Sequence, residues 1–117
     1  MTLEIVSIGD ELLDGHIVNF NAQVIAKKLN EKGYSVAQVT TLPDDKKKLK
    51  EGMGDAMKRS SLFIVTGGLG PTGDDRTREI LAELFDTPLI YDEKAASYLI
   101  ERYGENCPGL INQATLP

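Results

Sequence analysis

A glycine-rich segment at residues 66–73 (TGGLGPTG) is the part of the chain best suited to bind a ligand. The apolar run at 62–65 before it is typical of a buried parallel strand. The segment after it is amphipathic, with Ile80, Leu81, Leu84 and Phe85 on one helical face. Glycine has no Cβ and tolerates positive φ, so the backbone can approach a ligand closely. Because the N–H groups of a helix start favour anions, the segment predicts a phosphate-binding loop.

The spacing of these glycines is that of a dinucleotide fingerprint, G-x-G-x-x-G, and Asp92 lies at a suitable distance for a ribose contact. However, the loop follows the third predicted strand, whereas the fingerprint normally follows the first. Asp74 and Asp75 also come where a bare pyrophosphate would rest, and a carboxylate about 4 Å from a phosphate charge costs roughly 4 kcal/mol at an effective dielectric of 20. A P-loop is excluded because no lysine follows the glycines. Either a cation separates the acids from the phosphate, or the acids point elsewhere.

Acidic residues follow each of three predicted strands, at 3–8, 35–42 and 62–65. They are Asp10, Glu11 and Asp14, then Asp44 and Asp45, then Asp74 and Asp75. Ligands of parallel sheets bind beyond the carboxyl ends of the strands, where these acids lie. Carboxylates suit Mg²⁺ or Mn²⁺ rather than zinc, so we expect a cation-assisted phosphate site for phosphoryl or nucleotidyl transfer or hydrolysis. Asp74 has a second interpretation, as a helix N-cap with Thr77 in the first turn, which the sequence leaves open.

Helices between these strands predict an α/β fold with a parallel sheet and right-handed crossovers. One helix is opened by Asn19 or Asn21 and stopped by Gly33, and another follows Asp45. Their predicted buried residues are Phe20, Val24, Ile25 and Leu29 in the first, and Leu49, Met53, Ala56 and Met57 in the second. Residues 88–91 predict a short fourth strand, Asp92 caps a further helix, and 104–117 are irregular or short-helical.

The composition, 117 residues with 41% hydrophobic residues and a net charge of -5, predicts one soluble domain spanning residues 1–117. An acidic chain argues against nucleic acid as a partner, and the basic run at 46–48 is expected on the solvated face of a helix. One cysteine and one histidine exclude an internal disulfide and argue against a zinc site. Since no run has the length of a membrane span and no signal pattern is present, we expect no membrane partner and a cytoplasmic location.

Several motifs together resemble the CinA family, specifically its N-terminal domain in the molybdopterin-binding, MoaB/MogA-like superfamily. They are GDELL at 9–13 with Gly15, Asn21, TGGLGPT at 66–72, and D-D-x-T at 74–77. The similarity runs from Ile5 to Thr77, with further likeness at 112–114 and 116–117. It implies a three-layer α/β/α domain with a mostly parallel sheet. Family domains continue beyond the segment that matches 112–117, so the resemblance implies a sheet that is incomplete at the C-terminus, with an exposed edge.

By motif position, the resemblance implies catalytic roles for Asp44 and Asp75. Together with Asp10 they would bind a divalent metal, Mg²⁺, Mn²⁺ or Co²⁺. The implied ligand-binding residues are Gly9, Asp10, Glu11, Asn21, Thr66, Gly67, Gly68, Gly70, Thr72 and Thr77. For Asn21, a role as a helix cap is an equal alternative.

Three functions remain open. The first is a CinA-like nucleotide pyrophosphatase domain that hydrolyses ADP-ribose-type pyrophosphates with a divalent metal, favoured by GDELL and LGPT. The second is molybdopterin binding or adenylylation in molybdenum cofactor biosynthesis. The third is a non-catalytic nucleotide- or pterin-binding module. In each case the partner is a small molecule, and the superfamily resemblance is compatible with a homodimer or homotrimer.

Overall fold

The structure, a computed structural model, describes residues 1–117, which form two compact units. Unit 1 is Met1–Gly67 and unit 2 is Gly68–Pro117, and each is described by itself. Unit 1 contains β1 (Leu3–Ile8), α1 (Asp10–Leu13), α2 (Phe20–Glu31), β2 (Val36–Leu42), α3 (Lys46–Arg59) and β3 (Leu62–Thr66). Unit 2 contains α4 (Thr77–Leu84), β4 (Ile90–Tyr91), α5 (Glu93–Tyr103), α6 (Leu110–Ala114) and β5 (Thr115–Leu116).

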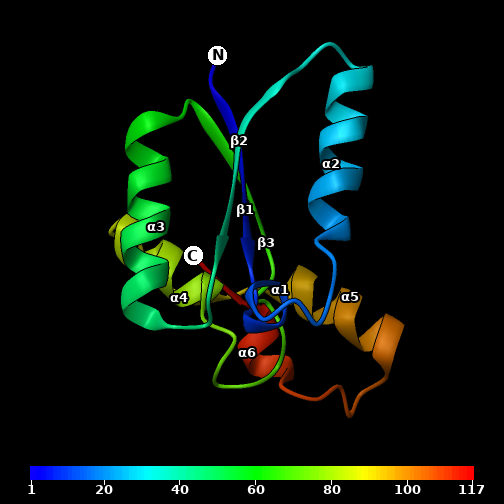
Figure 1. Cartoon of the computed structure of the whole chain (residues 1–117). Coiled ribbons are helices and arrows are strands. Elements are labelled where there is room, and N and C mark those ends of the chain that lie inside the picture. The colour runs from blue at the N-terminus through cyan, green and yellow to red at the C-terminus, as the bar shows by residue number, and fades with distance from the viewer. The chain divides into compact units, whose positions relative to one another are not determined.

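Unit 1 is built on a parallel sheet with the strand order β2-β1-β3 (Figure 1). The central strand β1 is buried along its whole length, and its Ile5 pairs with Val39 of β2 and Ile64 of β3. In Figure 1, α2 and α3 lie on opposite sides of this sheet. Right-handed crossovers require this arrangement, because the chain moves from β1 to one neighbour through α2 and then across to the other neighbour through α3. The predicted α/β/α layering with a parallel sheet is confirmed.

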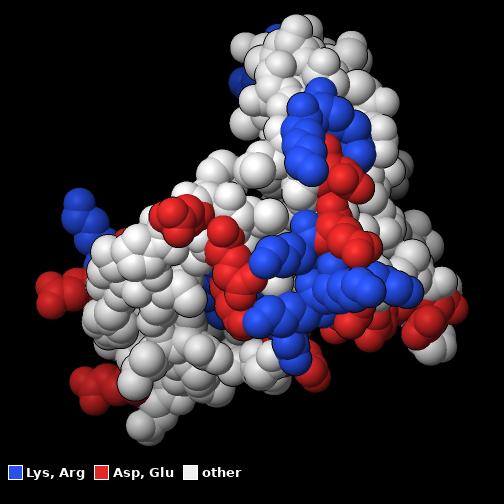
Figure 2. Space-filling model, turned by 90° about the vertical axis from the view of Figure 1, so that its left-hand side faces the viewer, with Lys and Arg blue, Asp and Glu red and all other residues white.

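Helix α3 covers one face of the sheet with residues spaced three or four apart. Leu49, Met53 and Ala56 are fully buried, as the sequence predicted, and Asp45 caps the helix by accepting a hydrogen bond from Lys48 N at 3.1 Å. The lysines at 46–48 are exposed. Figure 2 faces the side of the molecule on which α3 lies in Figure 1, and it shows basic and acidic side chains interleaved. The basic run is therefore part of a solvated, mixed-charge face.

The start of α2 is fixed by Asn19 rather than Asn21. Asn19 Oδ1 accepts from Ala22 N at 3.3 Å, and its Nδ2 donates to the Oγ of the buried Ser7 on β1 at 2.9 Å. One side chain thus caps the helix and attaches it to the central strand. Phe20 is 64% exposed, so its predicted place on the buried face is wrong. It is the first residue of the helix, in which Ala22 is buried and the predicted buried residues Val24, Ile25 and Leu29 are half-buried.

One acidic side chain is buried inside the sheet of unit 1. Glu4 of β1 is 1% exposed, and its Oε1 accepts from Arg59 Nε of α3 at 2.8 Å. Its other oxygen, Oε2, has no hydrogen-bond partner. A buried carboxylate is tolerated only with a cation close by, so this ion pair anchors the C-terminal end of α3 to the sheet.

In unit 2, α4 begins at Thr77, and Ile80 on this helix is fully buried. Strands β4 and β5 pair antiparallel, with Ile90 opposite Leu116. The predicted fourth strand at 88–91 is therefore reduced to two residues and pairs with the C-terminal segment. Asp92 caps α5 as predicted and accepts from Lys94 N at 3.0 Å. No helix of the chain is long and apolar enough to cross a membrane.

Candidate functional site

The carboxyl ends of β1 and β2 are joined by a reciprocal pair of aspartates. Asp10 N donates to Asp44 Oδ2 at 3.0 Å, and Asp44 N donates to Asp10 Oδ1 at 2.9 Å. One residue earlier, Gly9 N donates to Leu42 O at 3.0 Å. Each loop therefore fixes the other, and two carboxylates that lie 34 residues apart in sequence stand side by side. We call Gly9, Asp10 and Asp44 the rim.

The rim provides part of what a hard cation requires. The reciprocal bonds use one oxygen of each aspartate, and the second oxygen of each remains outside these bonds. Mg²⁺ is commonly held by one or two carboxylates and keeps several waters, so the donor chemistry of this pair fits it. Within unit 1, and within unit 2, no three His, Cys, Asp or Glu side chains form a group that could hold a metal ion. The predicted set of Asp10, Asp44 and Asp75 is divided between the units, and it stays a prediction.

Two further predicted ligand-binding residues of unit 1 are exposed. Glu11 lies in the first turn of the short helix α1, and its backbone oxygen accepts from His16 N at 3.1 Å and Ile17 N at 3.2 Å. Asn21 lies in the first turn of α2 and does not cap that helix, because Asn19 does. The alternative interpretation of Asn21 as a cap is therefore wrong, and its ligand role stays a prediction.

The glycine segment begins where β3 ends at Thr66. Gly67 has φ 93°, and a Cβ at this position would collide with the backbone oxygen of Ile8 at the end of β1. Glycine is therefore required both by the backbone conformation and by the close approach of the two strand ends. This contact keeps the exit of β3 against the end of the strand that leads into the rim.

In unit 2 the segment is attached to the start of α4. Gly68 has φ 66°, and a Cβ there would collide with Oγ1 of the buried Thr77. Thr77 N donates to Gly68 O at 3.1 Å. Thr77 therefore holds the loop from the helix side, in addition to the first-turn position and the ligand role that the sequence suggested for it.

The carboxylate of Asp75 turns back onto the loop. Its Oδ2 accepts from Thr72 N at 3.0 Å and from Thr72 Oγ1 at 2.8 Å. Partial burial raises the pKa of Asp75, but hydrogen bonds from Thr72 and the Gly70 backbone, together with the charge of Arg78, leave it below its usual value. Asp75 is thus an ionised residue that holds the loop in shape. Its predicted catalytic and metal-binding roles stay predictions.

Asp74 does not cap α4. The residue before this helix is Arg76, which makes no side-chain capping bond, and Asp74 is exposed. The interpretation of Asp74 as an N-cap is therefore wrong. The helix begins later than the sequence suggested, because the chain turns at residues 72–75, where Asp75 N donates to Thr72 O at 3.1 Å.

Arg78, the second residue of α4, binds the glycine loop and was not among the predicted site residues. It is 8% exposed, and its guanidinium donates to Leu69 O at 2.7 Å and to Gly70 O at 3.2 Å. Burial lowers the pKa of Arg78, and Asp75 opposes that shift. The signal in the sequence was that an acid, Asp75, lies three residues before Arg78, but because Asp75 precedes α4 this spacing does not by itself bring the two side chains together.

A cavity of about 340 Å³ in unit 2 opens beside these groups. It is lined by Thr72, Gly73, Asp75, Arg78, Glu79, Leu89, Asn112 and Thr115. Its volume is in the range of small-molecule sites, and its lining includes the charged side chains of Asp75, Arg78 and Glu79. Of its lining residues, the sequence identified only Thr72 and Asp75 as ligand-binding or catalytic.

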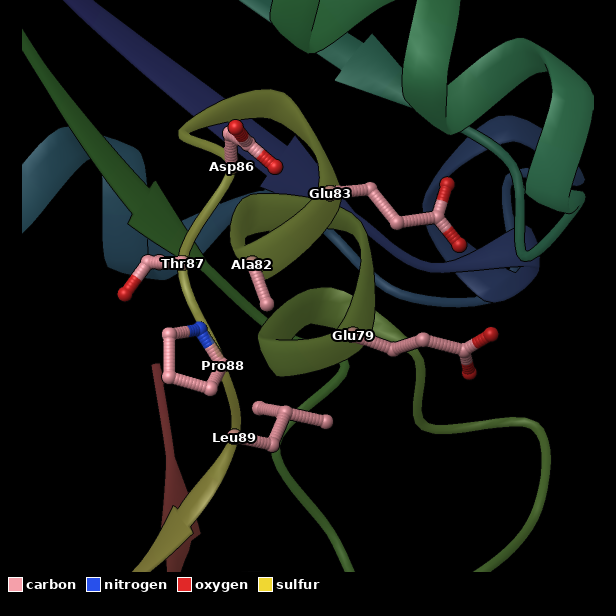
Figure 3. A pocket seen from close by; sticks show the side chains of 7 residues that line it. All are labelled: Glu79, Ala82, Glu83, Asp86, Thr87, Pro88 and Leu89. Carbon is pink, nitrogen blue, oxygen red and sulfur yellow. The ribbon is translucent and has the colours of Figure 1, made fainter.

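A larger cavity of unit 2, of about 470 Å³, is less suited to a ligand. Figure 3 shows that Glu79 and Glu83 point to one side of α4, whereas Thr87 and Pro88 lie on the other side. Its polar groups do not converge on one point. A third cavity, also of about 470 Å³, lies in unit 1 along the edge strand β2 and α3 and includes Arg59. Neither cavity is lined by a predicted site residue.

Residues 4–115 match the protein family described as "Probable molybdopterin binding domain". The chain belongs to this family. It is 43% identical over 101 residues to a CinA-like protein of Thermosipho melanesiensis, covering 86% of this chain and 25% of that protein. It is also 43% identical over 118 residues to a CinA-like protein of Dictyoglomus turgidum, covering 97% of this chain and 29% of the relative. The chain therefore spans about a quarter of the length of these relatives.

Solved structures place this member of the molybdopterin-binding family with CinA. The protein CinA of unknown function from Thermoplasma acidophilum superimposes with a TM-score of 0.87 at 32% identity, over 99% of this chain and 70% of that one. The molybdopterin biosynthesis enzyme MoaB of Thermus thermophilus gives a TM-score of 0.69 at 20% identity, over 97% of this chain and 72% of that one. The first likeness confirms the CinA resemblance, and the second shows a shared fold.

Proposed function

We propose that this CinA-like, molybdopterin-binding-type domain is a nucleotide pyrophosphatase domain that hydrolyses ADP-ribose-type pyrophosphates with a divalent cation. The observation that carries the proposal is the rim. There, two carboxylates on adjacent parallel strands are held together by each other's backbone N–H groups. Such an arrangement is prepared before any ligand arrives, so no reorganisation is required to present two negative charges to a cation.

The reaction hydrolyses the phosphoric anhydride bond of the diphosphate. Water adds to one phosphorus atom, the bond to the bridging oxygen breaks, and AMP and ribose 5-phosphate leave. A bound divalent cation supplies charge neutralisation of the diphosphate and lowers the pKa of a coordinated water. Asp10 and Asp44 would hold it through the oxygens that the reciprocal bonds do not use. Both charges of the rim would contribute to holding the cation.

The glycine loop would receive the diphosphate. Gly67 and Gly68 have left-handed backbone conformations and pack against Ile8 O and Thr77 Oγ1, so the shape of the loop is set before a ligand arrives. Asp75 keeps the loop in shape through Thr72 and stays ionised at neutral pH. It would therefore repel a bare phosphate, and it is compatible with a diphosphate that arrives with a cation.

A second candidate is molybdopterin binding or adenylylation, and the family description favours it. The cavity beside Thr72, Arg78 and Asn112 has room for a small heterocycle and offers charged and polar partners on its wall. Under this candidate the loop would hold the terminal phosphate of the pterin and the phosphates of ATP.

The two candidates are separated by a product assay on the 117-residue chain. ADP-ribose is supplied with Mg²⁺, Mn²⁺, Co²⁺ or no metal, and ribose 5-phosphate and AMP are detected through a coupled phosphatase. In parallel, molybdopterin and ATP are supplied, and adenylylated pterin is detected by mass spectrometry. Metal-dependent phosphate release from ADP-ribose alone supports the pyrophosphatase. Adenylylated pterin without ADP-ribose turnover supports the second candidate, and binding without any product refutes both as activities of this chain.

A further inference from the structure

The peptide plane between Leu69 and Gly70 is held from both of its ends. Its carbonyl oxygen, that of Leu69, accepts from Arg78 Nη1 at 2.7 Å. Its N–H, that of Gly70, hydrogen-bonds to the carboxylate of Asp75. Because the C=O and N–H of a trans peptide point in opposite directions, a donor on one side and an acceptor on the other fix its rotation.

The same guanidinium also fixes the next carbonyl. Arg78 Nη2 donates to Gly70 O at 3.2 Å, so two successive carbonyls are turned toward α4. The closeness of Asp75 explains why residue 70 is a glycine, since a Cβ there would lie 2.7 Å from Asp75 Oδ2. Arg78 is 8% exposed, and a charge that is buried to this degree needs its hydrogen bonds satisfied. Arginine is suited to this position because its planar fork presents two donors side by side.

We propose that Arg78 is a positioning residue that, together with Asp75, sets the orientation of the glycine loop for a diphosphate. The inference rests on the proposed function for the identity of the ligand and on the three hydrogen bonds above for the geometry. Arg78 binds the carbonyl oxygens of Leu69 and Gly70, and it lines the cavity with Thr72 and Asp75. Because the guanidinium holds these two oxygens, they are not free to turn toward a phosphate and repel it, so the contact favours an anion beside the loop.

The test compares Arg78→Lys, which keeps the charge but not the fork, with Arg78→Gln, which keeps neither. Arg102→Lys is the matched control, because Arg102 is an exposed arginine of α5. Amide hydrogen exchange of residues 68–75 reports the loop directly and needs no ligand. Calorimetric titration with inorganic pyrophosphate and with ADP-ribose, each with Mg²⁺, reports the consequence for binding.

We expect loop exchange to accelerate about tenfold or more in both variants of Arg78, as the loss of charge-assisted hydrogen bonds implies. The dissociation constants for both ligands should rise by about tenfold or more, and Arg102→Lys should change neither quantity. Lysine must fail to restore the loop, since a point charge cannot bind both carbonyls in the geometry of the fork.

Wild-type loop exchange in Arg78→Lys, or wild-type affinity in that variant, would overturn the positioning role. A uniform acceleration that includes the amides of β1 would also overturn it, because the effect would then be a general loss of stability. If the wild-type chain binds neither ligand but its loop exchange still depends on Arg78, the pyrophosphatase proposal fails. The positioning of the loop by Arg78 would stand in that case.

Discussion

Replacing Asp44 with asparagine should separate the charge of the rim from its architecture. Asparagine keeps one side-chain oxygen, so it can still accept the hydrogen bond from Asp10 N, which is 3.0 Å long in the wild type. The second bond, from Asp44 N to Asp10 Oδ1, does not involve the altered side chain at all. Asp44→Asn is therefore expected to retain the joined loops and to lose only the negative charge.

The expected loss of stability and the expected loss of rate differ in magnitude. A charge-assisted hydrogen bond exceeds a neutral one by about 1 kcal/mol, so unfolding of Asp44→Asn should become easier by no more than roughly that amount. Removal of a charge that stabilises a cation and a developing transition state costs about 100-fold or more in rate, which is about 2.7 kcal/mol or more. Asp44→Ala removes the acceptor as well, so its loss of stability should exceed that of Asp44→Asn.

The assay measures kcat/KM for ADP-ribose as a function of Mg²⁺ concentration, and urea unfolding of the same samples. Asp55→Asn is the matched control, because Asp55 is an exposed aspartate of α3 that lies outside the rim. It should leave both quantities unchanged. Turnover of Asp44→Asn within about threefold of the wild type would refute the role of the charge. A stability loss as large as that of Asp44→Ala would refute the retained hydrogen bond.

Four further predictions concern the stability of the fold. Gly67→Ala should lower the free energy of unfolding by about 2 kcal/mol or more in urea titrations, because its φ of 93° and a backbone collision oppose any side chain. Gly73→Ala should change it by less than about 0.5 kcal/mol, since open space surrounds that position. Arg59→Met should cost about 3 kcal/mol in the same titrations by leaving the carboxylate of Glu4 buried and unpaired, and stability equal to the wild type would exclude the pair as an anchor. The pKa of Asp75 is lowered in the folded state, so its contribution to stability is present above the unfolded pKa near 4 and is lost as pH falls through the folded value. Thermal melts of Asp75→Asn should consequently lose less stability than the wild type between about pH 5 and pH 2, and parallel acid profiles would contradict this sign.

The fold of unit 1 could be predicted from the sequence because the apolar patterns of its strands and helices are local and periodic. The apolar run that became β1 and the stripe of Leu49, Met53 and Ala56 in α3 gave the sheet and one covering layer. Parallel topology then implied that the residues after β1 and β2 meet, as Asp10 and Asp44 do. The sequence could not show that each carboxylate is bound by the other's backbone, since that depends on how two loops meet.

Around the glycine loop the sequence was less informative. Capping propensity placed Asp74 at the helix start, but the Asp75 carboxylate binds Thr72 and the chain turns before α4 begins. Capping propensity is a local rule, and here a different local hydrogen bond decided where the helix begins. The sequence alone does not show which of two such local interactions is the stronger. The pairing of β4 with β5 was missed for a different reason. Two-residue strands have no period, and their partners are set by tertiary contacts.

The glycine motif itself is explained by the chain before any ligand is considered. Each of three glycines faces a different obstacle: Gly67 the backbone oxygen of Ile8, Gly68 the Oγ1 of Thr77, and Gly70 the carboxylate of Asp75. The pattern G-G-x-G is therefore what a strand end, a helix start and an acid require of the loop that joins them. A phosphate ligand cannot be inferred from these glycines alone. It has to be argued within each unit separately, from the paired carboxylates of the rim in unit 1 and from the guanidinium that binds the loop carbonyls in unit 2.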